Sequence, residues 1–354
     1  MNLIEQTCAA IPAPHELSRA RVQERLNQLT KPPGSLGRLE ELALCLSALQ
    51  GTDRPRTARK LSVIFAADHG VCARGVSAYP QAVTGQMVAN FLNGGAAINV
   101  LARQFGARVL VVDMGVAYPL PIPADAAVFR NCSLGPGTGD FIDGEAMTEA
   151  QARAALETGI RLALEQADAG LDVIAAGEMG IGNTTPSSAI TALVTKHPVD
   201  AVVGPGTGVT GALLQRKHEV VRQAVEKHSA WSGGIDLLRR VGGFEIGAMA
   251  GLMLGAASRR IPFLLDGFIA TAAALVACTM APAVRPYLLA AHCSQEPGHR
   301  IALQHLELEP YLDFQMRLGE GTGAAMLFPV LDAAVAVLNQ MATFASAEIS
   351  GGAE

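Results

Sequence analysis

Short apolar runs alternate with longer, alanine-rich apolar segments from residue 61 onward. Most of the short runs end at an acidic residue or a glycine, a pattern typical of parallel strands joined by crossover helices. We expect strands near six ranges, namely 61–67, 108–113, 172–176, 201–204, 262–266 and 287–291. The pattern therefore predicts an α/β fold, with an open, mostly parallel, Rossmann-like sheet of about six strands and helices on both faces.

The first fifty residues follow a different pattern, with leucine and valine at helical spacing on two successive faces. The break Lys31-Pro32-Pro33-Gly34 separates the two faces. The apolar segment from Ala324 onward predicts a final helix that packs back against these N-terminal helices. We expect residues 1–55 with about 331–354 to form a small helical domain, and residues 56–330 to form the α/β catalytic domain.

Composition narrows the class of protein. Half of the 354 residues are apolar, the net charge is −5 and no basic block is present, which argues against a nucleic-acid partner. The six cysteines form no C-x-x-C pair, as expected for reduced thiols in a cytoplasmic protein. The apolar stretch 268–284 is short for a membrane span and contains Pro282, so we expect a buried helix there and no span.

Polar groups follow several of the predicted strands. Because the carboxyl ends of parallel strands meet at one edge of a sheet, these groups are expected to converge on one site. The segments are Asp68-His69-Gly70, Asp113-Met114-Gly115, Gly177-Glu178-Met179-Gly180, Asp266-Gly267 and His292-Cys293-Ser294.

The segment from Gly177 to Pro186 is glycine-rich and is expected to lead from a strand into a helix. Backbone amides at such a helix start favour a phosphate, although a tight turn without a ligand is the simpler alternative. The spacing also resembles a dinucleotide fingerprint, but its third glycine is missing. The next suitable acid, Asp200, precedes its predicted strand, which weakens an NAD interpretation.

Three segments share a G-x-G-T-G pattern, at 135–139, 204–208 and 319–323. Proline occupies the second position of the first two, whereas Glu320 occupies it in the third. Glu320 is therefore a candidate for chemistry, since a turn alone has no use for a carboxylate. The second loop precedes the helix that carries Lys217, which could reach a phosphate or could be an ordinary solvated lysine.

Four residues are of metal-binding types, namely His292, Cys293, Glu296 and His299, but their spacing is not a recognised zinc pattern. Pro297-Gly298 interrupts any helix that would bring them onto one face. We therefore expect a polar loop there and no metal or cofactor. A direct Asp68–His69 dyad is not expected, because adjacent residues at a strand end point to opposite sides. No G-x-S-x-G elbow and no P-loop lysine motif occurs.

Taken together, these motifs resemble the nicotinate-nucleotide:dimethylbenzimidazole phosphoribosyltransferase family. The resemblance extends over nearly the whole chain, and the motifs in this order are highly specific. They are residues 31–40 (KPPGSLGRLE), 67–71 (ADHGV), 75–80 (GVSAYP), 83–84, 86–87, 94–99 (GGAAIN), 177–185, 243–251 (GFEIGAMAG), 266–269 (DGFI), 292–299 and 317–323 (RLGEGTG).

The resemblance implies transfer of phosphoribose from nicotinate mononucleotide to 5,6-dimethylbenzimidazole, giving α-ribazole 5'-phosphate and nicotinate. Glu320 matches the family's catalytic base, and Glu178 would be a second carboxylate near the ribose. The aromatic base would contact Tyr79, Gln86, Met179 and Leu318. The nucleotide would contact Gly180, Gly182, Asn183, Thr184, Gly204, Gly206, Thr207, Gly208 and Lys217.

The resemblance also implies a homodimer in which subunit contacts help to enclose the site. Ala78 and Ala291 stand where some family members have serine, which leaves the polar contacts to the aromatic base open. Two other interpretations remain at this point. One is an NAD-dependent oxidoreductase, and the other is a nucleotide sensor that keeps the glycine loops but has no use for Glu320.

Overall fold

The computed structural model describes residues 1–120, 125 and 127–350. Its centre is one six-stranded sheet in the order β3-β2-β1-β4-β5-β6, in which every neighbouring pair is parallel. This is the Rossmann order, with its switch point between β1 and β4, and it confirms the predicted fold class. The strands are β1 Lys60–Ala67, β2 Ala107–Gly115, β3 Phe129–Asn131, β4 Val173–Met179, β5 Phe263–Leu265 and β6 Leu288–Ala290.

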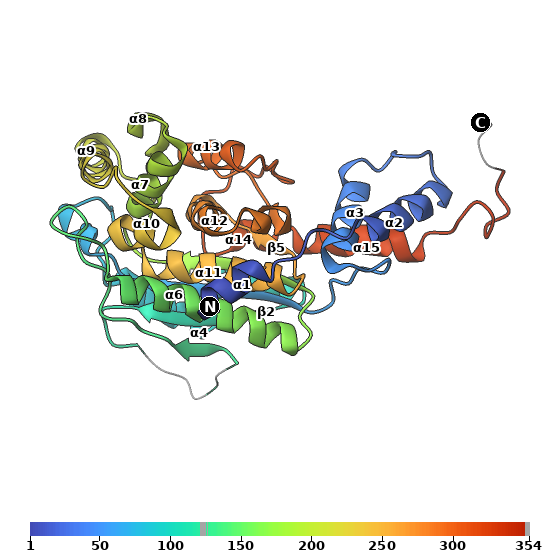
Figure 1. Cartoon of the computed structure of the whole chain (residues 1–354), viewed down its shortest axis with the longest axis horizontal. Coiled ribbons are helices and arrows are strands. Elements are labelled where there is room, and N and C mark those ends of the chain that lie inside the picture. Colours follow the sequence, from blue (N-terminus) through green and yellow to red (C-terminus); the bar gives the residue numbers. More distant parts are fainter. Residues whose placement is uncertain (121–124, 126, 351–354) are drawn as a thin grey trace.

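Helices connect the strands and extend beyond both ends of the sheet (Figure 1). Up to β4 they are α1 Leu3–Ala9, α2 Glu16–Gln28, α3 Arg38–Gln50, the 3₁₀ turn η1 Gly70–Arg74, α4 Val83–Leu92, α5 Ala97–Gln104 and α6 Glu149–Asp168. After β4 they are α7 Thr184–Thr195, α8 Val199–Val202, α9 Gly211–Lys227, α10 Gly233–Val241, α11 Phe244–Ser258, α12 Phe268–Met280, η2 Pro282–Tyr287, α13 Pro297–His305, α14 Thr322–Ala325 and α15 Phe328–Gln340.

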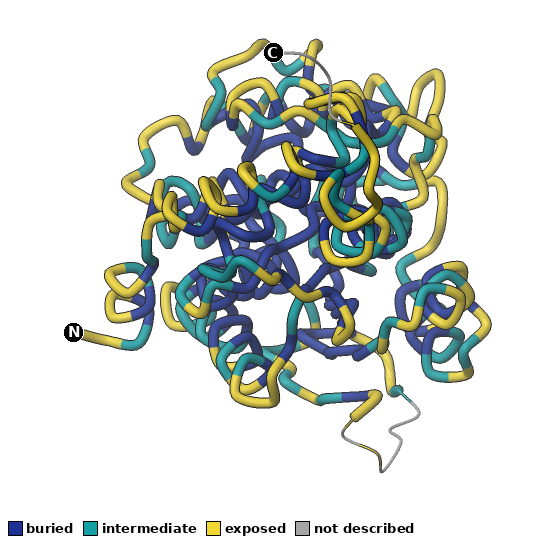
Figure 2. Tube along the Cα trace, turned by 90° about the vertical axis from the view of Figure 1, so that its right-hand side faces the viewer, coloured by how far each residue is buried: buried dark blue, intermediate teal, exposed yellow. Residues whose placement is uncertain are grey.

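The strand side chains alternate between two hydrophobic cores. On β1, Val63 and Phe65 join a core with α6, α11 and α12, whereas Ile64 and Ala66 join a second core with α4, α5, α14 and α15. Buried residues accordingly fill the middle of the molecule in Figure 2, and exposed residues lie on the outer turns. Both faces of the sheet are covered, which explains why its strands are apolar throughout.

Helices α2, α3 and α15 pack together at one end of the molecule (Figure 1). Their contact includes Leu26, Leu46 and Leu331, and it confirms that the final helix returns to the N-terminal helices. Helix α1 instead packs on α6 and α11 of the main body. The proposed boundaries between a helical and a catalytic domain stay a prediction.

Two apolar stretches bear on the membrane question. Residues 268–280 form α12, which is largely buried, as expected. By length and composition, the helical stretch Thr322–Gln340, which comprises α14 and α15, is the one among the described residues that could cross a membrane. Half of it is buried inside the protein, as is common for a core helix of a globular fold.

The prediction of a strand at 201–204 is wrong. Pro198 instead caps the one-turn helix α8, and Gly204 begins the loop that follows it. An apolar run of this length fits either a strand or a buried helical turn, so periodicity alone could not separate them. The sixth strand is β3, whose three residues Phe129-Arg130-Asn131 are too few and too polar to form a recognisable pattern.

Candidate active site

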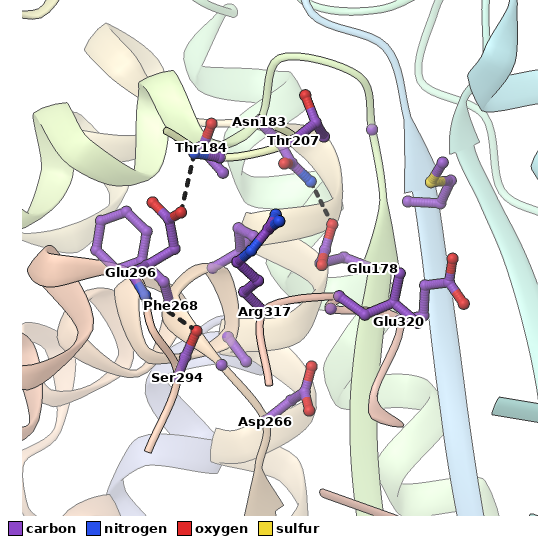
Figure 3. Close-up of a pocket in the computed structure, with 18 of the residues that line it drawn as sticks. Glu178, Asn183, Thr184, Thr207, Asp266, Phe268, Ser294, Glu296, Arg317 and Glu320 are labelled. Atoms are coloured by element: carbon purple, nitrogen blue, oxygen red, sulfur yellow. Dashed lines mark hydrogen bonds between the residues drawn. The ribbon is translucent and has the colours of Figure 1, made fainter. Parts of the chain in front are cut away.

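A cavity of about 710 Å³ opens at the carboxyl ends of β4, β5 and β6 (Figure 3). This is the edge of the sheet at which the polar strand ends were expected to converge, and three of the five segments do line the cavity. Its lining includes Tyr79, Val83, Met87, Glu178, Met179, Gly180, Asn183, Thr184, Gly206, Thr207, Asp266, Phe268, His292, Ser294, Glu296, Arg317, Leu318 and Glu320.

The loop before α14 carries Glu320 in a left-handed backbone conformation, with φ 63° between Gly319 at 83° and Gly321 at 78°. Left-handed φ values are uncommon outside glycine, so Glu320 is held there by its surroundings. The loop lies directly on β4, because a Cβ added to Gly177 would come within 2.2 Å of the Glu320 carbonyl carbon. Glycine at 177 therefore allows the third glycine loop to approach Glu178.

Burial, together with the nearby Asp266 carboxylate, raises the pKa of Glu320 to about 7. The side chain is only 7% exposed. Its carboxylate has no hydrogen-bond partner among residues 1–120, 125 and 127–350. A buried carboxylate that titrates near neutral pH and keeps its oxygens free is suited to accept a proton from a ligand.

Glu178, the second carboxylate, lies near the end of β4 and is 6% exposed. Burial raises its pKa to about 8. A hydrogen bond donated by Asn183 opposes this rise, whereas the charges of Asp266, Glu245 and Glu320 add to it. Glu178 and Glu320 thus form a pair of acids whose protonation is linked.

The 204–208 loop is held in place by two buried charged side chains. Lys217 of α9 donates from Nζ to the Gly204 carbonyl and to Thr184 Oγ1, both at 2.8 Å. Glu296 accepts a hydrogen bond from the Gly206 amide at 2.9 Å. Burial lowers the pKa of Lys217 to about 8. Burial raises the pKa of Glu296, against the opposing effects of Lys217, the Gly206 amide and Arg317.

The structure brings most of the predicted site residues to the cavity. These are Tyr79, Glu178, Met179, Gly180, Asn183, Thr184, Gly206, Thr207, Leu318 and Glu320. Four others lie behind this lining or beside it, namely Gly182, Gly204, Gly208 and Lys217. Gln86 is exposed on α4, one turn after the lining residue Val83, and is not itself part of the lining.

No substrate contact was predicted for several lining residues, chiefly Asp266, Phe268, Glu296 and Arg317. Arg317 lies between Glu296 and Glu178 in the view of Figure 3. Asp266 was singled out only as a strand end. Its backbone partners lie 55 and 58 residues further along the chain, so no local pattern could reveal the contact.

As predicted, Asp68 and His69 do not pair with each other as a dyad. Asp68 accepts a hydrogen bond from the Ala117 amide, and His69 Nε2 pairs with Glu245 Oε1 at 2.7 Å. Burial lowers the pKa of His69, but the Glu245 and Asp68 carboxylates more than offset this and raise it. This buried pair lies beneath Gly180, where an added Cβ would come within 3.0 Å of His69 Nε2.

The first glycine loop, 135–139, bonds to the segment that follows β1 and is outside the cavity lining. The Thr138 amide donates to the Asp68 carbonyl, and the Thr138 carbonyl accepts from the Gly70 amide.

Within the part of the chain that the structure describes, no three His, Cys, Asp or Glu side chains are placed to hold a metal ion. Glu296 holds the Gly206 amide, and His299 Nδ1 accepts from the Ser294 amide at 2.9 Å.

Comparison with known proteins agrees with this geometry. A family model described as phosphoribosyltransferase matches residues 11–349. Nicotinate-nucleotide–dimethylbenzimidazole phosphoribosyltransferase from Roseiflexus sp. (strain RS-1) is 52% identical over the full length of both proteins. The chain belongs to this family of phosphoribosyltransferases. Its relative of the same name from Desulforamulus reducens is 49% identical over 99% of this chain and 100% of that protein.

A solved structure of a relative has the same fold as this chain. The crystal structure of CobT from Thermus thermophilus superposes with a TM-score of 0.90, at 46% identity over 95% of this chain and 100% of that one. Membership in the phosphoribosyltransferase family confirms the resemblance drawn from the motifs. It favours the transferase interpretation over the oxidoreductase and over the nucleotide sensor.

Proposed function

We propose that this protein transfers the 5-phosphoribosyl group of nicotinate mononucleotide to 5,6-dimethylbenzimidazole, as the names of its relatives state for them. The products would be α-ribazole 5'-phosphate, used for the lower ligand of cobalamin, and nicotinate. The observation that carries the proposal is the Glu320 carboxylate, which has a pKa of about 7 and no hydrogen-bond partner among the described residues. It lies in a cavity shared with the loop that Lys217 supports.

The chemistry requires one base and no external acid. Nicotinate leaves with the electron pair of its bond to the anomeric carbon, since its ring nitrogen is already cationic in the nucleotide. A benzimidazole nitrogen attacks the same carbon from the opposite side, with inversion. Its other ring nitrogen then loses a proton, and Glu320 accepts that proton.

Glu178 acts on the ribose side in this proposal. With a pKa of about 8, it is mostly neutral in the empty site at pH 7. A bound pyridinium cation favours the ionised carboxylate and so lowers its pKa. The ionised form then stabilises the positive charge that develops on the ribose as nicotinate departs.

The two substrates occupy different parts of the cavity. Tyr79, Met179 and Leu318 offer an apolar slot for a flat bicyclic ring, with Gln86 nearby on α4 as a proposed polar contact. The nucleotide phosphate and ribose bind at the glycine-rich loops, where backbone amides and a buried ammonium favour an anion. These residues are Gly180, Gly182, Asn183, Thr184, Gly204, Gly206, Thr207, Gly208 and Lys217.

We also propose a cytoplasmic homodimer. Tyr79 and Leu318 line the cavity yet are 52% and 57% exposed, so the aromatic-base side is open in a single chain. A second copy that covers this side would exclude water from the reaction. Sedimentation equilibrium is expected to give twice the 36.8 kDa mass of one chain, and a monomer at assay concentration would contradict the dimer.

The direct test of the function is incubation with nicotinate mononucleotide and a series of acceptors, comprising 5,6-dimethylbenzimidazole, other benzimidazoles and purines. Released nicotinate and the new nucleotide are separated by chromatography. We expect nicotinate release that requires a benzimidazole and matches the new nucleotide in amount. Binding of the mononucleotide without release by any acceptor would favour a nucleotide sensor.

A further inference from the structure

Asp266 follows β5 directly and is anchored to the loop that carries Glu320. Its Oδ2 accepts a hydrogen bond from the Gly321 amide at 3.1 Å, and its Oδ1 accepts one from the Ala324 amide at 3.0 Å. Asp266 is only 3% exposed, so water competes weakly for these bonds. Both carboxylate oxygens therefore hold the backbone that immediately follows Glu320.

The loop needs such an anchor, because three successive residues have left-handed φ values. A charged acceptor makes stronger hydrogen bonds to backbone amides than a neutral one. The loop is also confined from other sides. Gly177 of β4 lies against the Glu320 backbone, and a Cβ added to Gly323 would come within 1.9 Å of the His292 ring. Among the residues that the structure describes, Asp266 is the ionisable side chain that bonds directly to the loop backbone.

Asp266 is also a charge close to the proposed base. The ionisable groups that line the cavity with Glu320 come from several elements, namely Tyr79 before α4, Glu178 of β4, Asp266 after β5, His292 and Glu296 after β6, and Arg317 of the loop itself. His292 Nε2 lies 3.6 Å from Asp266 Oδ1. Of these groups, Asp266 combines a direct bond to the loop with a charge that favours the protonated form of Glu320.

We propose that Asp266 is a positioning residue that sets both the orientation and the basicity of the Glu320 carboxylate. The proposal rests on the proposed phosphoribosyl transfer with Glu320 as base. It assigns two separable effects to one side chain. The shape of Asp266 orders the loop, and its charge determines the pH at which Glu320 becomes ionised.

Two substitutions separate these effects. Asp266→Asn removes the charge and keeps one acceptor oxygen, but its amide nitrogen replaces the other oxygen and cannot accept from a backbone amide, so the position of the acidic limb, and not the size of kcat, reports the charge. We expect the acidic limb of the kcat profile to move to lower pH by roughly one unit, because a like charge near Glu320 has been removed. Asp266→Glu keeps the charge but displaces it. We expect its acidic limb to stay close to that of the wild type, while kcat falls at least tenfold.

Asp113→Asn is the control for the loss of a buried anion. Asp113 lies near the end of β2 and is 6% exposed, and its Oδ1 accepts the amides of both Gly115 and Val116 at 2.9 Å, so asparagine can keep both bonds. It is outside the cavity lining. We expect this variant to keep the wild-type pH profile, so that a shift in Asp266→Asn reports charge at the site and not the loss of a buried anion in general.

The profiles of kcat and KM are measured from pH 5 to 9 for all three variants, and calorimetric binding of nicotinate mononucleotide verifies folding. An unmoved acidic limb in a folded Asp266→Asn would contradict the proposal, and so would a raised KM alone, which would assign Asp266 to substrate binding. If the asparagine variant does not fold, Asp266→Glu decides, and an unchanged kcat overturns the proposal. Absence of turnover in the wild type would instead refute the proposed function, and this inference with it.

Discussion

At the scale of single residues, the site combines buried ionisable groups that serve different purposes. Glu320 is buried without a hydrogen-bond partner among the described residues, whereas Lys217 is buried with two. An unpartnered acid is available to a substrate, but a satisfied ammonium mainly holds its neighbours in place. Lys217 thus supports the loop at 204–208 from behind and adds positive charge beneath it.

Lys217→Met tests this role, because it removes the ammonium but keeps much of the apolar chain. The Gly204 carbonyl and the Thr184 hydroxyl lose a donor, which costs about 1–3 kcal/mol of stability. We expect the Kd for nicotinate mononucleotide to rise at least tenfold in calorimetric titrations. Lys227→Met, at the end of the same helix, is the control and should bind normally. Equal affinities for the two variants would rule out the assigned role.

At the scale of elements, the site depends on close contact between β4 and the loop before α14. Gly177 is central because its missing side chain lets the backbone of Glu320 lie against the strand. Glu178 is the next residue of the strand, so one contact places both carboxylates at the same cavity. The glycine pattern around Glu320 marked this loop in the sequence, but not the strand on which it packs.

Gly177→Ala is expected to displace this loop, since the new methyl carbon would meet backbone atoms only 2.2 Å away. Backbone cannot move aside as a flexible side chain can, so we expect kcat to fall by about 10²-fold, as for a misplacement of about 1 Å. Gly144→Ala serves as the control, because its added Cβ meets nothing within 4 Å. Steady-state assays of both variants check the prediction, and near wild-type activity in Gly177→Ala would contradict it.

Elements with a clear apolar pattern in the sequence could be predicted. Five of the six expected strands, the N-terminal helices and the return of α15 all follow from periodicity. The run at 201–204 could not be assigned, because four apolar residues fit a strand or one helical turn. Contacts such as Asp266 with Gly321, or His69 with Glu245, join distant parts of the chain and leave no local pattern.

At the scale of the whole molecule, the Rossmann strand order brings the glycine loops and the acidic groups to one edge of the sheet. Helices α14 and α15 then run from the Glu320 loop to the bundle with α2 and α3 (Figure 1). The active site is therefore attached to the main core at β4 and to the helical end through α15. Burial of the two acids, Glu178 and Glu320, lowers the free energy of unfolding by an amount that depends on pH.

The effect of these two buried acids on stability is measurable as a change in the free energy of unfolding with pH. Glu178 and Glu320 have folded pKa values of about 8 and about 7, above the usual 4.5. The stability that these two groups contribute is complete below pH 4.5. It is lost as the pH rises from 4.5 to about 7 for Glu320 and to about 8 for Glu178, and the free energy of unfolding falls by up to about 1.4 kcal/mol per pH unit for each group.

Glu178→Gln removes one of these groups, so its stability should fall less steeply than that of the wild type between pH 5 and 8. Urea unfolding at several pH values provides the comparison. The exposed Glu149→Gln on α6 is the control and should follow the wild type. Parallel pH dependences of Glu178→Gln and the wild type would mean that burial does not raise the pKa of Glu178.

The central claim is that Glu320 accepts the proton of the attacking benzimidazole. The most direct measurement is the single-turnover rate of nicotinate release by Glu320→Gln and by the wild type, with nicotinate mononucleotide and 5,6-dimethylbenzimidazole both saturating. We predict unchanged mononucleotide binding, a rate reduced by about 10²–10⁴-fold and loss of the acidic limb near pH 7. A glutamine variant that releases nicotinate at close to the wild-type rate, with the acidic limb intact, would contradict the account.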